Sequence, residues 1–155
     1  MPALVNAMRE VHELDAYPSV WPEQPERFLA PPDTVAGWVA EANGRVVGQV
    51  LLRQPAEPPG WMIEAGLTDP DFIIISRLFV APSGRKRGLA ENLFQTAWAA
   101  AEKQGLTPVL DVHHKNHAAI RLYERQGWQR TATVNGNWTD PDGSVPRVHV
   151  YLPPN

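Results

Sequence analysis

The sequence predicts an α/β fold built on a mixed, mostly antiparallel sheet with one parallel pair of strands at its centre and helices on both faces. A hairpin pattern predicts antiparallel strands, because residues 38–41 and 45–52 flank Asn43-Gly44, a pair that tolerates the positive φ angles of a tight turn. The second half alternates strand, helix, strand, helix, which implies right-handed crossovers and a parallel pair. Residues 128–134 and 147–152 form a second hairpin pattern around a turn-rich segment.

The remaining elements follow from hydrophobic spacing along the chain. Leu4, Met8 and Val11 recur at helical intervals, so we expect an opening helix with no strand before it. Residues 17–32 predict a proline-punctuated crossover with one short helical turn, and residues 54–71 predict a loop.

The central strand is expected at Phe72–Val80, followed by an amphipathic helix that begins near Leu89 and stops at Gly105. A short strand at residues 108–112 comes next, and Asn116 then has the position of a helix N-cap. Two parallel strands that separate leave a cleft at their C-terminal ends, so the chemistry is expected there.

Composition indicates one domain over residues 1–155 and narrows the possible partners. A length of 155 residues with 43% hydrophobic and 20% charged residues is typical of one globular domain. A formal net charge of −3 gives no global attraction for a polyanion, so we expect no nucleic-acid partner. The chain has no cysteine, which excludes thiolate nucleophiles and fits a cytoplasmic setting. No apolar run approaches the roughly 20 residues that span a bilayer, so no membrane partner is expected.

A short basic loop between the central strand and the next helix has the features of an anion site. Gly84 and Gly88 flank its basic residues. Backbone N–H groups at a helix start converge, the helix dipole adds about half a positive charge, and glycine allows close approach of a phosphate. A pyrophosphate would fit, although a solvated basic turn that caps an ordinary helix has the same pattern. The glycine spacing matches neither a Walker A loop nor a dinucleotide-binding fingerprint.

Two motifs resemble those of the GNAT superfamily of acyl-CoA N-acyltransferases. After a strand that ends in Val80-Ala81-Pro82, the segment Arg85-Lys86-Arg87-Gly88-Leu89-Ala90 is similar to the family's coenzyme motif, Arg/Gln-x-x-Gly-x-Gly/Ala. Asn116, the segment 118–124 and Gly127-Trp128 resemble the family's later Asn-x-x-Ala-x-x-Leu-Tyr-x-x-x-Gly-Phe pattern, with tryptophan in place of phenylalanine. Together the two motifs cover about half of the chain.

The resemblance implies acetyl-CoA as co-substrate, no metal, and particular coenzyme-binding residues. Main-chain groups of the central strand would pair with the pantetheine arm, and amides of the basic loop would hold the pyrophosphate. An asparagine would bind the pantetheine, and a tyrosine near the coenzyme sulfur would protonate the departing thiolate as the catalytic acid. In this sequence these residues are Leu78, Phe79 and Val80 on the strand; Arg85, Lys86, Arg87, Gly88, Leu89 and Ala90 in the loop; Asn116; and Tyr123.

The sequence departs from the family pattern in two ways. The family begins with a strand before its first helix, and this chain lacks it, so one sheet edge is expected to be shorter or supplied by a partner. We therefore expect a homodimer through the sheet edge or the closing hairpin. The family often carries a glutamate base on the central strand, and residues 72–80 contain no acid. Candidate bases, among which the sequence does not choose, are Glu64, Asp71, Asp111 and His113.

The expected function is transfer of an acetyl group from acetyl-CoA to a primary amine of a small molecule or peptide by direct attack. The missing central-strand acid motivates an alternative, a non-catalytic acyl-CoA-binding sensor or interaction module. A metal site at His113 and His117 is disfavoured, because the helix begins between them and they would not share a face. Trp21 and Trp138 are candidates for the acceptor pocket.

Overall fold

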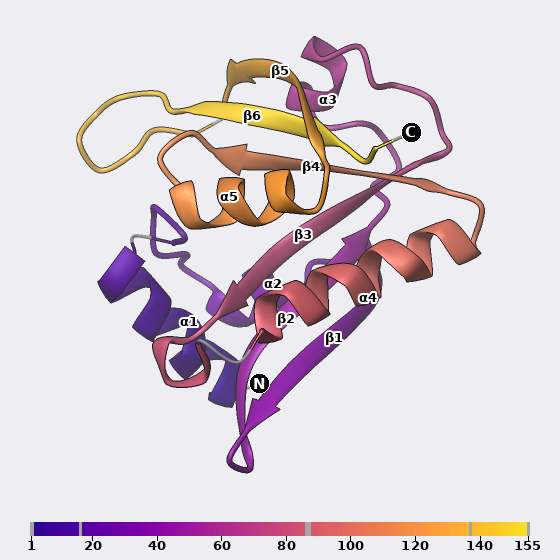
Figure 1. Ribbon diagram of the computed structural model, residues 1–155. Helices are drawn as coiled ribbons and strands as arrows, with labels where there is room; N and C mark the ends of the chain where they lie inside the picture. The colour runs from indigo at the N-terminus through magenta and orange to yellow at the C-terminus, as the bar shows by residue number, and fades with distance from the viewer. Residues whose placement is uncertain (1, 16, 86–87, 137, 155) are drawn as a thin grey trace.

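The computed structural model describes residues 2–15, 17–85, 88–136 and 138–154 and contains one six-stranded mixed sheet (Figure 1). The strand order is β1-β2-β3-β4-β6-β5, with β3 and β4 parallel and the other neighbouring pairs antiparallel. This confirms the predicted mixed sheet with a central parallel pair. The strands are β1 Thr34–Ala42, β2 Arg45–Arg53, β3 Phe72–Val80, β4 Thr107–His113, β5 Gln129–Asn135 and β6 Arg147–Leu152.

The helices agree with the sequence prediction except in one loop. They are α1 Pro2–Asp15, α2 Pro25–Leu29, α3 Gly60–Glu64, α4 Leu89–Lys103 and α5 His117–Arg125, with a 3₁₀ turn at Pro82–Gly84. The loop predicted at residues 54–71 contains α3, because Met62 is buried and its carbonyl accepts a hydrogen bond of 2.8 Å from the Leu67 amide. The first described element is α1.

Helices cover both faces of the central strands. Residues 47–52 of β2 are all buried, which requires cover on each face because alternate side chains point in opposite directions. Both α1 and α4 pack on β2 and β3, and Figure 1 shows α4 crossing the face of the sheet turned to the viewer. No helix in the described residues is long and apolar enough to cross a membrane.

The parallel pair separates after a short stretch. In the described residues β3 and β4 pair at three positions, from Phe72 with Thr107 to Ile74 with Val109. Beyond that point β4 pairs with β6, while β3 continues beside β2 to the pair of Gly48 with Val80. The second half of β3 therefore has a described strand partner on one side only, and Figure 1 shows the two strands separating. The predicted cleft is confirmed by a groove lined by Leu78, Phe79 and Val80.

An irregularity in β3 lies where the two strands separate. The register between β2 and β3 shifts between Gln49 and Leu51, so that β3 carries one extra residue, as in a β-bulge. Arg77 in this segment has a φ of 55°, in the left-handed region that a non-glycine residue seldom adopts. Bulges and strained φ angles of this kind often re-aim a side chain next to a functional site.

Gly48 provides a test of the close approach between β2 and β3. A Cβ atom on Gly48 would lie 2.5 Å from the Phe79 carbonyl oxygen, so Gly48→Ala should lower the free energy of unfolding by about 1–3 kcal/mol. Gly60→Ala is the matched control, because a Cβ atom there meets nothing within 4 Å. Urea denaturation followed by circular dichroism measures both variants. Equal stability of the two would contradict the packing described here.

Candidate functional site

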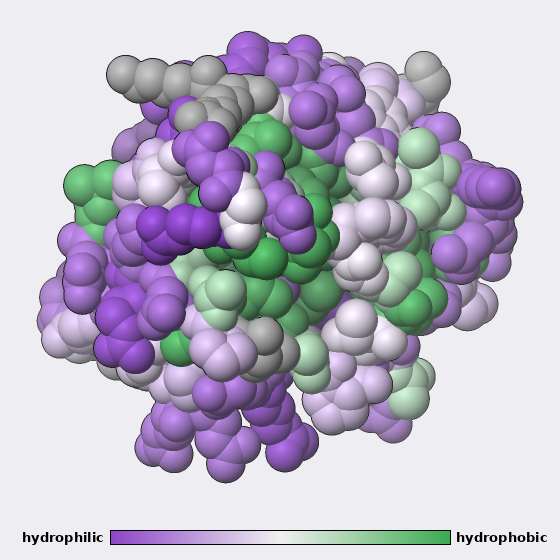
Figure 2. Space-filling view, turned by 90° about the horizontal axis from the view of Figure 1, so that it is seen from below, coloured by the Kyte–Doolittle hydropathy of each residue, from purple (hydrophilic) through white to green (hydrophobic). Residues whose placement is uncertain are grey.

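A groove opens where β3 and β4 separate. It has a volume of about 470 Å³ and lies among α1, the second half of β3 and the N-terminal ends of α4 and α5. Figure 2 shows apolar residues gathered deep in this side of the molecule, with hydrophilic residues around them. Of the sequence-predicted site residues, the groove is lined by Leu78, Phe79, Val80, Arg85, Gly88, Leu89, Ala90 and Asn116. Lys86 and Arg87 lie outside the described residues.

The N-terminus of α4 presents main-chain donors to the groove. Gly88 is the residue before the helix, with a φ of 70°, and no side chain caps the helix. Its carbonyl accepts the hydrogen bond of 3.0 Å from Asn92, so the amides of Leu89, Ala90 and Glu91 precede the first of the helical bonds. A Cβ atom on Gly88 would meet nothing within 4 Å, which leaves space for a ligand. Uncapped amides with a positive helix end are suited to a pyrophosphate.

Arg85 adds a positive side chain beside these amides. Its Nε donates a 3.0 Å hydrogen bond to the Val80 carbonyl, and its Nη2 forms an ion pair with Asp15 at the end of α1. Both Arg85 and Asp15 line the groove. The guanidinium is thus held at the groove by partners on two elements. Asp15 could not be identified from the sequence, because it lies 70 positions away from Arg85.

Asn116 begins α5 as predicted. Its Oδ1 accepts a 3.3 Å hydrogen bond from the Ala119 amide, the usual contact of an N-cap residue. This contact uses only the side-chain oxygen, so the two N–H groups on Nδ2 can donate to other partners. Because Asn116 also lines the groove, these donors can meet a ligand there.

Tyr123 lies deeper than the groove wall. Its side chain is 6% exposed and packs against Phe94 with ring centroids 5.1 Å apart, while its neighbour Leu122 lines the groove. Burial raises the pKa of the Tyr123 hydroxyl, and nearby Tyr17 and Asp111 raise it further. The hydroxyl therefore keeps its proton at neutral pH, and the three polar groups lie near one another around the strand split.

Two of the candidate bases lie far from the groove. Glu64 is the last residue of α3 and Asp71 immediately precedes β3, so both are near the N-terminal end of that strand. The groove is formed by its C-terminal half. Both acids are exposed. Their position argues against a direct part in chemistry at the split.

His113 has both ring nitrogens engaged. Nε2 lies 2.9 Å from an Asp140 carboxylate oxygen, and Nδ1 accepts a 3.1 Å hydrogen bond from the Lys115 amide. Burial opposes ionisation of Asp140, but hydrogen bonds from His113, Ser19 and Trp138 hold its pKa below the usual range. A histidine with both nitrogens occupied is poorly placed to accept a proton from a substrate.

Trp138 connects loops on this side of the molecule. Its Nε1 lies 2.8 Å from Asp140 and 3.1 Å from the Ser19 hydroxyl in the crossover after α1. Trp21, the other predicted pocket tryptophan, lies beside His12 with ring centroids 5.4 Å apart and under the Arg9 guanidinium. In the described residues no three potential ligands are grouped to hold a metal ion.

Asp111 is the candidate base that lies at the split. The last parallel pair joins Ile74 and Val109, and Asp111 lies two residues further along β4, where that strand pairs with β6. Burial raises the pKa of the Asp111 carboxyl, and the neighbouring Arg77 guanidinium partly offsets that rise. A carboxylate in such surroundings accepts a proton more readily than one in water.

Besides Asp15, two further residues at or beside the groove were not found from the sequence. Tyr17 lines the groove and faces the Phe79 ring with centroids 6.4 Å apart, and burial raises its pKa. Arg77 lies in the β3 bulge, where its φ of 55° could not be inferred from an apolar strand pattern. A proline-rich crossover and a strand interior gave no signal that would single out either residue.

A sheet whose parallel strands separate beside a groove that reaches the uncapped amides of a helix is the arrangement of coenzyme A-dependent acyltransferases. The model of the acetyltransferase (GNAT) family matches residues 5–128. The chain belongs to that family.

Curated relatives are similar over part of their length. The chain is 35% identical over 95 residues to N-acetyltransferase family 8 member 2 of Rattus norvegicus, covering 61% of this chain and 38% of the relative. N-acetyltransferase 8 of Mus musculus is 34% identical over 95 residues, which again cover 61% of this chain and 38% of the relative. The match thus spans less than half the length of these relatives.

Solved structures share the fold over nearly the whole chain. A ribosomal-protein-alanine N-acetyltransferase from Brucella melitensis has a TM-score of 0.72 at 19% identity, covering 97% of this chain and 91% of that one. Arabidopsis thaliana NAA60 in complex with acetyl-CoA has a TM-score of 0.69 at 18% identity, covering 97% and 93%. A putative phosphinothricin N-acetyltransferase has a TM-score of 0.71 at 18% identity, covering 98% and 90%. At these identities the likeness shows the fold.

Substitution at Gly88 tests the anion site with a matched pair of variants. Gly88→Asp should weaken coenzyme A binding at least about 10-fold, because it places a carboxylate beside the phosphates. Gly88→Asn has nearly the same shape and tolerance of the positive φ angle, so it isolates the effect of charge. Titration calorimetry with coenzyme A measures both dissociation constants. Equal coenzyme A affinities of the two variants would show that the phosphates do not lie beside Gly88.

Proposed function

We propose that the chain transfers an acetyl group from acetyl-CoA to a primary amine of a small molecule or peptide by direct attack. One observation carries the proposal: the groove runs from the uncapped amides of α4 along the second half of β3 to Tyr17, and Asp111 and Tyr123 lie near Tyr17, beyond the residues that line the groove. A thioester held along this path would reach a base and an acid at the same point.

The residues present fit the coenzyme. Amides from Gly88 to Ala90 and at Arg85 would hold the pyrophosphate, and we extend this role to Lys86 and Arg87 on the motif alone. The free side of β3 at Leu78, Phe79 and Val80 would bind the pantetheine as an added strand, with the Asn116 amide group beside it. Bound acetyl-CoA supplies a thioester, whose carbonyl carbon accepts the amine.

Asp111 is the base in this proposal. An alkyl amine has a pKa near 10.4 in water, so its neutral, nucleophilic form is scarce at neutral pH. The Asp111 carboxylate takes one proton from the ammonium and passes it to water. The neutral nitrogen can then attack the carbonyl carbon, while main-chain N–H groups of the split strand stabilise the oxyanion.

Tyr123 is the acid. The C–N bond forms and the C–S bond breaks, so the thiolate needs a proton and the nitrogen must lose one. The Tyr123 hydroxyl, kept protonated by burial, donates to the sulfur and is reprotonated with the proton that the nitrogen loses. The products are the N-acetylated amine, coenzyme A and the proton released through Asp111.

We further propose that residues 1–155 form one domain that acts in the cytoplasm as a homodimer. The edge strand β1 supports a dimer, because Val35 and Val39 are 47% and 52% exposed on it. Sedimentation velocity distinguishes a dimer from a monomer, and a monomer at micromolar concentration would contradict this part of the proposal.

Turnover with an amine panel tests the function directly. We expect coenzyme A release from acetyl-CoA with at least one class among polyamines, amino acids, aminoglycosides and peptide N-termini. Coenzyme A at about a hundred times its Kd should also stabilise the fold by about 2.7 kcal/mol. Stabilisation without turnover on the whole panel would contradict catalysis and favour the acyl-CoA sensor.

Variants of the two proposed catalytic groups should affect rate rather than coenzyme affinity. Asp111→Asn and Tyr123→Phe should each lower kcat about 100-fold or more. Activity of the native chain should rise with pH as Asp111 loses its proton, at a pH above the usual range for aspartate because burial raises its pKa. Asp111→Asn should abolish this rise.

Glu64→Gln is the matched control, since Glu64 is an exposed acid near the other end of β3. Pre-steady-state and steady-state rates across pH separate the chemical step from product release. An unchanged pH profile in Asp111→Asn would exclude Asp111 as the base, and full turnover in Tyr123→Phe would exclude the acid.

A further inference from the structure

Arg77 and Asp111 carry opposite charges on the two strands that separate. Arg77 lies in the β3 bulge, and Asp111 lies on β4 two residues beyond the last pair of the two strands. Burial raises the pKa of Asp111 and lowers that of Arg77, and the charge of each residue partly offsets the shift of the other. No ion pair within 4 Å joins them or either of them to another described residue.

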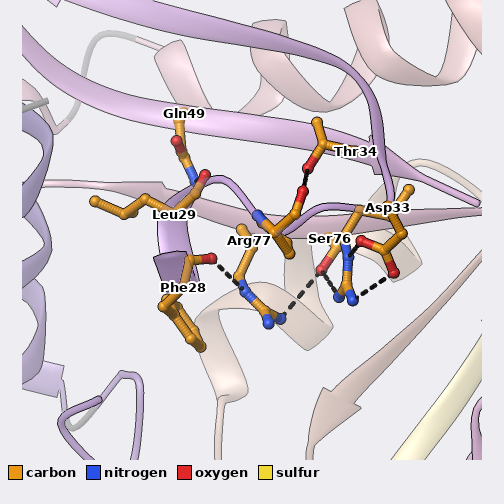
Figure 3. Close-up of polar contacts among 9 residues, drawn as sticks. Phe28, Leu29, Asp33, Thr34, Gln49, Ser76 and Arg77 are labelled. Carbon is orange, nitrogen blue, oxygen red and sulfur yellow. Dashed lines mark hydrogen bonds and ion pairs between the residues drawn. The ribbon is translucent and has the colours of Figure 1, made fainter. Parts of the chain in front are cut away.

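The Arg77 guanidinium is fixed in place with donors to spare. It stacks on the Phe28 ring at 3.9 Å, its Nε donates to the Phe28 carbonyl at 3.0 Å, and its Nη1 donates to the Ser76 hydroxyl at 3.3 Å (Figure 3). Arginine has five N–H donors, and these contacts use two of them. The side chain is half-buried. It is thus a positioned cation with donors that no described residue engages.

The neighbouring Arg53, which also donates to the Ser76 hydroxyl, has its charge neutralised by an ion pair. Its Nε and Nη2 bind the two carboxylate oxygens of Asp33 at 2.8 and 2.9 Å, the forked arrangement typical of a complete ion pair (Figure 3). Asp33 is therefore committed to Arg53. Arg77 differs because its charge has no such partner, although it lies in the same cluster and shares the Ser76 hydroxyl.

Opposite charges that are both partly withdrawn from water gain most when they are in contact. Here they lie on the two strands that separate, and both are near Tyr17, which lines the groove. A molecule that carries both a cation and an anion would give Asp111 and Arg77 each a partner of opposite charge. An ammonium belongs at Asp111, which is the proposed base, and an anion belongs at Arg77.

We propose that the acceptor is a free α-amino acid, whose ammonium binds Asp111 and whose carboxylate binds Arg77. This inference rests on the proposed acetyltransferase function and names its substrate class. A peptide N-terminus or a simple amine supplies the ammonium but lacks the adjacent carboxylate, so it leaves Arg77 without an anion. The contacts to Phe28 also hold α2, and a purely structural role for Arg77 would affect all acceptors equally.

The test compares acceptors that differ in the carboxylate alone. Leucine and phenylalanine are each set against the matching amino amide, which mimics a peptide N-terminus, and the decarboxylated amine. The native chain should favour the amino acid in kcat/KM by about 10- to 100-fold, the range expected for a charge-assisted contact. Arg77→Gln should raise KM for the amino acid and bring the ratio close to one. Arg77→Lys should restore part of the preference.

Gln49→Leu is the structural control. Gln49 donates a 3.3 Å hydrogen bond to the Leu29 carbonyl at the end of α2, so its loss loosens the same helix without removing a charge (Figure 3). This variant should keep the native ratio between amino acid and amide. A loss of the ratio in Gln49→Leu equal to that in Arg77→Gln would overturn the assignment to the guanidinium.

The outcomes separate the two proposals. Turnover of amides or amines as fast as amino acids overturns the α-amino acid assignment and leaves the acetyltransferase function intact. If the whole panel fails to react, calorimetry with coenzyme A present measures amino acid binding by itself. Binding of the amino acids that Arg77→Gln abolishes supports the assignment even then, and no binding overturns it.

Discussion

The split between β3 and β4 is the constraint on which the rest of the site depends. Parallel strands that part after three pairs leave one side of β3 without a strand partner, and buried main-chain groups need hydrogen bonds. An extended ligand can supply them. The same separation turns α4 and α5 toward one groove, so their N-terminal ends face the same space. One topological feature thus produces both the coenzyme groove and the point where chemistry is proposed.

The two ends of the groove differ in their charged groups, which suits one end to phosphate binding and the other to proton transfer. At one end, the α4 amides and the half-buried Arg85 are proposed to hold the phosphates of the coenzyme. At the split, Asp111, Tyr17 and Tyr123 have raised pKa values because burial disfavours their charged forms. Groups with shifted pKa values at the end of a groove are suited to proton transfer.

The sequence predicted the elements that local patterns specify. Asn43-Gly44, the apolar run of β3 and the capping position of Asn116 each depend on nearby residues, and each was placed correctly. The helix α3 was missed because five residues in a proline-rich loop carry too little periodicity. The sequence could name Asp111 as one of several candidate bases but could not prefer it to Glu64. The burial of Asp111 and its place at the split depend on how the strands pair. Tyr17 and Arg77 depend on the crossover and the bulge, which tertiary packing sets.

A crystal structure of the chain with acetyl-CoA would show whether this groove binds the coenzyme. We expect the pyrophosphate at the main-chain amides that open α4, and the pantetheine along the free side of β3 with its thioester near Asp111 and Tyr123. Coenzyme bound elsewhere, with this groove still open, would contradict it.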